Sequence, residues 1–152
     1  MVVCIDFRGW RAGLPVAGRG TSGATMRQRI LAVEDQDDNR QILRDLLTSA
    51  DFEVIEAVDG EAGLAAAAAN RPDLILMDIQ LPGMDGYETT RRLKADAGLQ
   101  AIPIVAVTSY ALGGDADKAR AAGCDGYISK PYSPRQLLAK VREYLSSTAP
   151  TR

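Results

Sequence analysis

The chain has 152 residues, of which 46% are hydrophobic and 25% charged, as expected for one folded domain. Its net charge of −2 gives no general attraction to nucleic acid or anionic lipid, and no apolar stretch approaches the roughly 20 residues of a membrane span. There is no histidine, which removes every mechanism with a histidine base or nucleophile. Two cysteines without further cysteine or histidine partners argue against a disulfide scaffold or zinc site. We therefore expect a cytoplasmic protein, in a reducing compartment, with no direct nucleic-acid or membrane contact.

Residues 1–25 differ from the rest of the chain because five glycines and a proline interrupt any regular pattern. We interpret them as a flexible extension. Our hypothesis is that Met26 is the natural start and that residues 1–25 are an over-extended reading frame; the alternative is a docking arm. The folded domain is expected at 26–148, followed by a tail at 149–152.

The first half of the domain alternates short apolar stretches with segments of helical spacing. In chain order these predict a strand at 30–33, a helix at about 37–50, a strand at 54–57, an alanine-rich helix at 61–70 and a strand at 74–78. The last of these strands is an unbroken apolar run, Leu74 to Met77, that leads directly into Asp78. Such a run, bounded by proline and glycine, predicts a strand buried on both faces of a parallel sheet.

The second half continues the alternation. In chain order it predicts a helix at about 85–96 with Arg91, Arg92 and Lys94 outward, a strand at 102–107, a short helix at 115–122 that buries Ala116, Ala119 and Ala122, a strand at 123–129, and a helix from 134 onward. Ser133, Pro134 and Gln136 are suited to the cap, first and third positions of that last helix. Five strand–helix repeats predict a doubly wound α/β fold, with helices on both faces of a parallel sheet and right-handed crossovers.

Polar residues follow the predicted strands where each strand ends. They are Glu34 and Asp35, Asp78, Thr108 and Ser109, and Lys130. In a doubly wound sheet these positions meet at one crevice. Carboxylates about 4 Å apart repel by roughly 4 kcal/mol at an effective dielectric near 20, so three of them need a cation. Oxygen ligands of this kind suit Mg²⁺.

A carboxylate, Mg²⁺, a lysine and a hydroxyl around one point predict a phosphoryl-transfer site. A carboxylate can act as the nucleophile and become an acyl phosphate. The cation and the lysine then offset charge on the phosphoryl oxygens.

These segments together resemble the receiver domains of two-component response regulators, over about residues 27–147. The resemblance rests on Val33-Glu34-Asp35, Leu76-Met77-Asp78, Leu81-Pro82-Gly83-Met84-Asp85-Gly86, Val107-Thr108-Ser109 and Tyr127-Ile128-Ser129-Lys130-Pro131. It implies a flavodoxin-like (βα)5 three-layer sandwich with a five-stranded sheet in the order 2-1-3-4-5, and a receiver domain at 26–148. It also implies a cis Lys130–Pro131 bond, which proline permits.

The resemblance further assigns roles to individual residues. Asp78 would be the phosphoacceptor. Mg²⁺ would be bound directly by Asp35, Asp78 and the backbone carbonyl of Gln80, and through water by Glu34. No other cofactor is implied.

Three residues would respond to the phosphoryl group. Lys130 would bind the phosphate, Thr108 would be the switch hydroxyl and Tyr127 the switch aromatic. Repacking of the face formed by the fourth helix, fifth strand and fifth helix would then alter partner binding.

The sequences at 73–82 and 123–131, around the third and fifth strands, resemble the DivK kind of stand-alone regulator, although receivers of hybrid kinases look similar. We expect a sensor histidine kinase or a histidine phosphotransfer protein as phosphodonor, a downstream protein target, and a monomer or a phosphorylation-linked dimer. The chain is not expected to be an enzyme beyond catalysing its own phosphoryl transfer and a slow dephosphorylation. The slow rate is expected because Gln80 and Tyr110, which flank the site, are not carboxylates able to activate water.

Other functions remain open alternatives. A flavin mononucleotide protein of the same layout needs a phosphate-binding loop after the first strand, but Glu34 to Asp38 would repel phosphate. A two-aspartate phosphatase needs a second acid where Gln80 stands. A phosphorylation-independent pseudo-receiver that only binds proteins is the strongest alternative. At single positions, Tyr127 could be a static core residue and Glu34 a solvated charge, and Asp37 and Asp38 could be the N-cap and first-turn acids of the helix.

Overall fold

The computed structural model describes residues 27–109 and 114–148. The expected extension at 1–25, the start at Met26, the loop residue Tyr110 and the tail at 149–152 lie outside the described residues. Within the described ranges, none of the helices combines the length and the apolar character that a membrane crossing requires.

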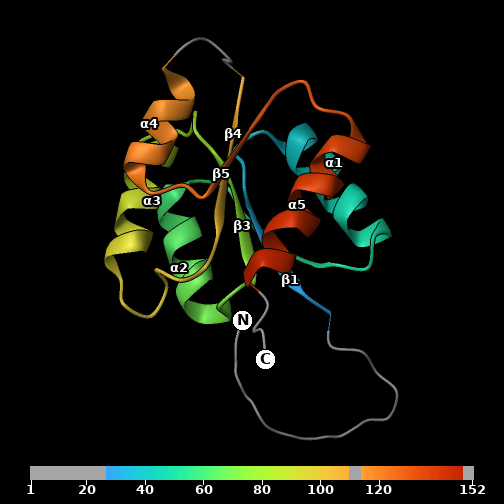
Figure 1. The fold of residues 1–152 in the computed structure, drawn as a ribbon, viewed down its shortest axis with the longest axis horizontal. Coiled ribbons are helices and arrows are strands. Elements are labelled where there is room, and N and C mark those ends of the chain that lie inside the picture. The colour runs from blue at the N-terminus through green and yellow to red at the C-terminus, as the bar shows by residue number, and fades with distance from the viewer. Residues whose placement is uncertain (1–26, 110–113, 149–152) are drawn as a thin grey trace, which may run out of the picture.

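The centre of the fold is one parallel sheet in the strand order β2-β1-β3-β4-β5 (Figure 1). The strands are β1 (Arg29–Val33), β2 (Glu53–Ala57), β3 (Leu74–Asp78), β4 (Ile104–Thr108) and β5 (Gly126–Ser129). This confirms the predicted (βα)5 flavodoxin-like sandwich and its strand order.

Helices cover both faces of this sheet. They are α1 (Asp37–Ser49), α2 (Gly60–Asn70), α3 (Gly86–Ala95), α4 (Asp115–Ala122) and α5 (Pro134–Thr148). Figure 1 shows α1 and α5 on one side and α2, α3 and α4 on the other. The buried side chains divide accordingly: Leu47 and Leu137 belong to the cluster under α1 and α5, whereas Ala67 and Leu93 belong to the cluster under α2 and α3.

The middle strand, β3, is fully enclosed in the sheet. It pairs with β1 on one side and β4 on the other, and all five of its residues are buried. Its apolar side chains alternate between the two clusters, because successive residues of a strand point to opposite faces. Burial on both faces therefore explains why the run Leu74 to Met77 is continuously apolar, and it fixes the position of Asp78.

Several predicted boundaries were displaced by local chemistry. β4 begins at Ile104, two residues later than predicted, because the Ile102 N–H is bonded to the Leu99 carbonyl and Pro103 has no N–H. β5 begins at Gly126 because the preceding residues close α4: Gly123, at φ 108°, is its left-handed C-cap, and the Cys124 N–H is bonded to Ala119.

Two predicted side-chain environments were wrong. Ala116 is exposed, so only Ala119 and Ala122 anchor α4 in the core. Lys94 does not point freely outward, because its Nζ donates to the Ile102 carbonyl at 3.0 Å and to Asp125 Oδ2 at 2.8 Å.

Helix starts follow the predicted chemistry in one case and not in another. At α5 the Gln136 N–H donates to Ser133 Oγ at 3.1 Å and the Ser133 N–H donates to Gln136 Oε1 at 2.8 Å, which confirms the predicted cap. At α1 the N-cap is Gln36, with no side-chain cap, and Asp37 and Asp38 occupy the first turn. The Lys130–Pro131 bond is cis, as expected.

Candidate functional site

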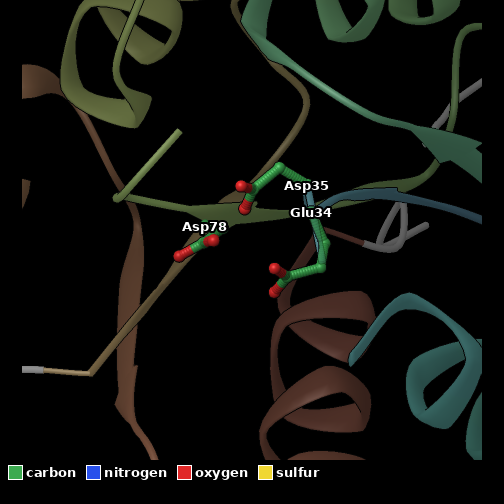
Figure 2. Close-up of side chains that lie close together, drawn as sticks. All are labelled: Glu34, Asp35 and Asp78. Carbon is green, nitrogen blue, oxygen red and sulfur yellow. The ribbon is translucent and has the colours of Figure 1, made fainter. Parts of the chain in front are cut away.

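Three carboxylates meet at the carboxyl edge of the sheet. Glu34 and Asp35 directly follow β1, Asp78 ends β3, and the two strands are paired with Val33 opposite Met77. One oxygen from each of the three side chains lies within 4.8 Å of the others (Figure 2). Glu34 is only 1% exposed and Asp78 only 4% exposed. Glu34 is therefore not a solvated surface charge.

Lys130 brings a positive charge to this cluster from the end of β5. Its Nζ lies 3.1 Å from Glu34 Oε1 and 3.9 Å from Asp78 Oδ1. The Lys130 N–H also donates to the Thr108 carbonyl at 2.7 Å, which ties the residue to the end of β4. The structure thus brings together the carboxylates and the lysine that the sequence predicted to be neighbours.

The surroundings of Asp78 make its ionisation unfavourable. Burial, and after it the nearby charge of Glu34, raise the pKa of Asp78 to about 7. Lys130 and the Gln80 N–H, which donates to Asp78 Oδ1 at 3.3 Å, lower that pKa only in part. One cation is thus insufficient for the two buried carboxylates.

The donor set fits a hard divalent cation. All three side chains offer carboxylate oxygens, two of them are almost completely buried, and no softer nitrogen or sulfur ligand is among them. Oxygen donors in this number suit Mg²⁺, which binds through a few carboxylates and retains water. The first-turn acids of α1 are not part of this group; Asp37 pairs with Arg40 instead.

The remaining predicted residues lie around the cluster at different depths. Thr108 ends β4 and is 2% exposed, whereas Gln80 is exposed in the loop after β3. Tyr127 is half-buried in β5 and packs with Ala106 and Ala119 on the α4 side of the sheet. Since Ala106 and Thr108 lie two residues apart on β4, strand alternation puts Thr108 on that same side.

The geometry agrees with the family to which the sequence is similar. The model of the response regulator receiver domain matches residues 30–142. The chain belongs to the response regulator receiver domain family. Among curated proteins, this receiver is 42% identical over 120 residues to the polar-differentiation response regulator DivK of Brucella anthropi, which covers 79% of this chain and 98% of that protein. The resemblance to DivK-type single-domain response regulators is thereby confirmed.

Solved structures share the same architecture. The receiver domain of sensor histidine kinase PA1611 from Pseudomonas aeruginosa PAO1 is 34% identical, with a TM-score of 0.75 over 80% of this receiver and 99% of that chain. That structure is described as having a magnesium ion coordinated in its active-site cleft. The chemotaxis protein CheY4 of Vibrio cholerae is 29% identical, with a TM-score of 0.75 over 78% of this receiver and 99% of that chain.

Two residues near the site were not singled out by sequence reasoning. Burial raises the pKa of Tyr132 to about 12, and the charges of Glu34 and Asp78 add to the effect, so this tyrosine borders the acidic cluster. Arg40 reaches from α1 to the backbone of the loop that carries Glu34 and Asp35. The sequence signal for Arg40 was its place early in α1, close to that loop. The sequence signal for Tyr132 was its place two residues after Lys130.

Proposed function

We propose that this receiver accepts a phosphoryl group on Asp78 from a partner phosphohistidine, with Mg²⁺ bound. The observation that carries the proposal is the Asp78 carboxylate, almost fully buried within 4.8 Å of Glu34 and Asp35 oxygens and 3.9 Å from Lys130. An Asp78 oxygen forms the new O–P bond while the P–N bond of the phosphohistidine breaks. Its electron pair stays on the imidazole nitrogen, which takes up a proton.

Asp35, Asp78 and the backbone carbonyl of Gln80 would hold the metal directly, and Glu34 would hold it through water. When bound, Mg²⁺ supplies positive charge that offsets repulsion among the carboxylates and the incoming phosphoryl oxygens. The raised pKa of Asp78 supports a need for such positive charge there. The three carboxylates form the cluster, and Gln80 lies two residues after Asp78 in the chain.

Lys130 and Thr108 would bind the phosphoryl oxygens once Asp78 carries them. Lys130 is only 20% exposed at its side chain and lies between Glu34 and Asp78, so a short shift would bring its ammonium group to a phosphate on Asp78. The Thr108 hydroxyl is buried at the end of the neighbouring strand, on the side of the sheet that α4 covers.

Tyr127 would carry this change to the α4–β5–α5 surface. It lies on the same side of the sheet as Thr108 and lines a hollow of about 230 Å³ together with Ala116, Lys140 and Tyr144. α4, which forms one wall, has only two buried alanines, so its rearrangement disrupts little apolar packing. A phosphoryl group that favours the rearranged packing by a few kcal/mol would shift the population strongly.

Receivers pair with histidine kinases or histidine phosphotransfer proteins, and we propose one of these as the phosphodonor and a protein as the downstream target. The likeness to DivK supports a stand-alone regulator acting in the cytoplasm, with residues 26–148 as the receiver domain. Its only catalysis would be its own phosphorylation and a slow dephosphorylation. The slow rate is proposed because Gln80 has no carboxylate to activate water.

The test uses the full chain, a small-molecule phosphodonor and Mg²⁺, with acid-labile phosphate measured by intact mass. Wild type and the Asp38→Asn control, altered at an exposed first-turn acid, should take up one phosphoryl group, whereas Asp78→Asn should take up none. Chelation of the metal should abolish uptake. Uptake by Asp78→Asn would overturn the assignment. No uptake by the wild type, together with intact partner binding, would favour the pseudo-receiver.

A further inference from the structure

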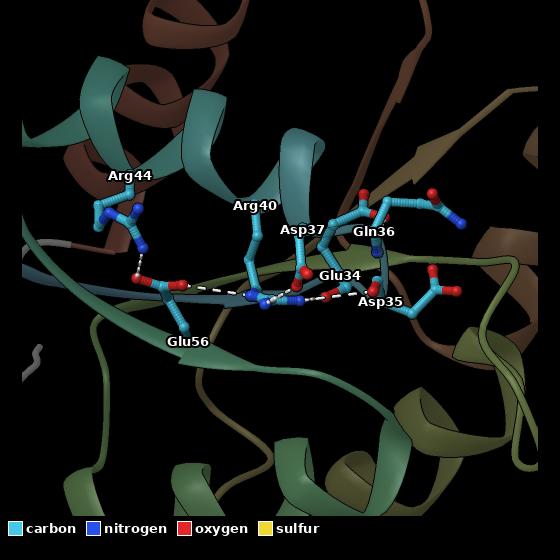
Figure 3. A network of polar contacts seen from close by, with 7 residues as sticks. All are labelled: Glu34, Asp35, Gln36, Asp37, Arg40, Arg44 and Glu56. Carbon is cyan, nitrogen blue, oxygen red and sulfur yellow. Dashed lines mark hydrogen bonds and ion pairs between the residues drawn. The ribbon is translucent and has the colours of Figure 1, made fainter.

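Arg40 hydrogen-bonds to the backbone of the loop between β1 and α1, which carries two of the three clustered carboxylates. Its Nη1 donates to the Glu34 carbonyl at 3.0 Å and to the Asp35 carbonyl at 3.4 Å. The other two guanidinium nitrogens bond Glu56 Oε1 at 3.2 Å and the Asp37 carboxylate. Figure 3 shows the side chain extending below α1 between Glu56 on β2 and the loop.

These contacts hold the Arg40 side chain in one position, unlike a solvated surface charge. Its side chain is 15% exposed, against 44% for Arg44, which also bonds Glu56. A guanidinium is planar and presents its donors in a rigid fork, so one group can bond a strand and a loop at the same time. Glu56 lies on β2, which pairs with β1, so its bond to Arg40 anchors the guanidinium to the sheet.

We infer that Arg40 is a positioning residue that sets the metal affinity of the phosphorylation site by holding the Glu34 and Asp35 backbone. The two residues whose carbonyls it binds are the two that contribute carboxylates from this loop. Fixing their backbone holds both carboxylates near Asp78 before a cation arrives, which reduces the ordering needed on binding. This inference rests on the proposed function.

Charge and positioning act on metal affinity in opposite directions, so the two roles can be separated. Arg40 is a cation close to the acidic cluster. If it acted only through its charge, it would repel Mg²⁺. Replacing it by a neutral residue would then strengthen metal binding, most at low salt. If Arg40 instead acts by holding the Glu34 and Asp35 backbone, the same replacement weakens metal binding, and the effect persists at high salt.

The experiment measures binding of Mg²⁺ to the metal-free full chain by calorimetry, and of Mn²⁺ by electron paramagnetic resonance, at low and high salt. Arg40→Met should weaken binding by about tenfold, the scale seen when a ligand-orienting partner is removed. Arg44→Met is the matched control: it removes the same charge from the same helix and the same Glu56 partner, but it touches no loop carbonyl. Its affinity should stay within about twofold or rise slightly.

A second variant guards against a folding defect in Arg40→Met. Arg40→Lys keeps the charge but replaces the rigid fork of three donor nitrogens by one ammonium on a flexible stem, so it should hold the loop less firmly and the metal affinity should also fall. Hydrogen exchange of the Gln36 amide, which donates to Glu34 Oε2 at 3.1 Å, should quicken in both Arg40 variants and not in Arg44→Met. Wild-type affinity in Arg40→Lys, or tighter binding in Arg40→Met, would overturn the inference alone. A wild-type chain that binds neither metal would overturn the proposed function as well.

Discussion

Lys130 is paired with Glu34 in this receiver, with the ammonium nitrogen 3.1 Å from the carboxylate oxygen. Asp78, the proposed phosphoacceptor, is farther from the same nitrogen, at 3.9 Å. Removing one partner of a buried ion pair leaves an uncompensated charge, so the buried Glu34 carboxylate keeps Lys130 at its side. Glu34 therefore has two effects on Asp78: it repels the Asp78 charge, and it holds the Lys130 ammonium away from Asp78.

Replacing Glu34 by glutamine should lower the pKa of Asp78 in the metal-free protein. The substitution removes the charge that raises this pKa and frees Lys130 to approach Asp78. The pKa should fall from about 7 but stay above the ordinary value of 3.8, because burial is the larger cause. A carboxyl-carbon NMR titration measures it, with Asp38→Asn as control. An unchanged or higher pKa would show that Glu34 does not govern the ionisation of Asp78.

Asp78→Asn should stabilise the metal-free protein at high pH and leave it little changed at low pH. A carboxyl whose folded pKa, about 7, exceeds its unfolded value of 3.8 binds protons more tightly when folded, so ionising it opposes folding. The cost is absent below the unfolded pKa and complete above the folded one.

The stability gain should therefore grow from near zero at about pH 4 to about 4 kcal/mol at about pH 8, since each of roughly three pKa units is worth about 1.4 kcal/mol. Urea unfolding of both proteins across this range provides the measurement. Mg²⁺ should stabilise the wild type at the upper end and leave Asp78→Asn nearly unaffected. A gain independent of pH would contradict the assigned pKa.

The sequence predicted the sheet and the acidic cluster well because both depend on short, continuous patterns. A run such as Leu74 to Met77 can be satisfied only by burial on both faces, and a parallel sheet then brings its strand ends together. Thr108 and Lys130 were placed correctly for the same reason.

What sequence reasoning missed are contacts made by long polar side chains. Lys94 and Arg40 both lie on helices where charge predicts solvent exposure, yet each reaches backbone carbonyls of a distant or adjoining loop. Their burial depends on how the loop is folded, which no local pattern records. The same limit applies to Ala116: its residue type favours burial, but it is exposed in the first turn of α4.

Ser133→Ala should destabilise the protein by about 1 kcal/mol, the usual effect of losing a helix cap. The Ser133 hydroxyl accepts the Gln136 N–H, and the start of α5 directly follows the loop that carries Lys130. Chemical unfolding should show the loss. Ser146→Ala, at an exposed position of the same helix, is the control and should change stability by less than about 0.5 kcal/mol. Equal effects would mean that the cap contributes nothing.

Gly86→Ala should destabilise this receiver although alanine favours helices over glycine by about 1 kcal/mol. Gly86 opens α3, and a Cβ added there would lie 2.3 Å from the Asp78 carbonyl oxygen and 2.7 Å from Ile79 Cα. Both are backbone atoms that cannot rotate away, so α3 or the end of β3 has to move. We expect a loss of about 1–3 kcal/mol in urea unfolding, as for other overpacked sites.

The same displacement should reach the proposed phosphorylation site, because the added Cβ presses on the backbone of Asp78. Mg²⁺ affinity should fall along with stability in Gly86→Ala. Gly98→Ala is the matched control: its added Cβ meets nothing closer than 3.4 Å, and the nearest atoms belong to side chains. It should leave both properties nearly unchanged. A Gly86→Ala protein as stable as the wild type would show that α3 can shift without cost. The close approach to the Asp78 backbone would then not be the reason for glycine at this position.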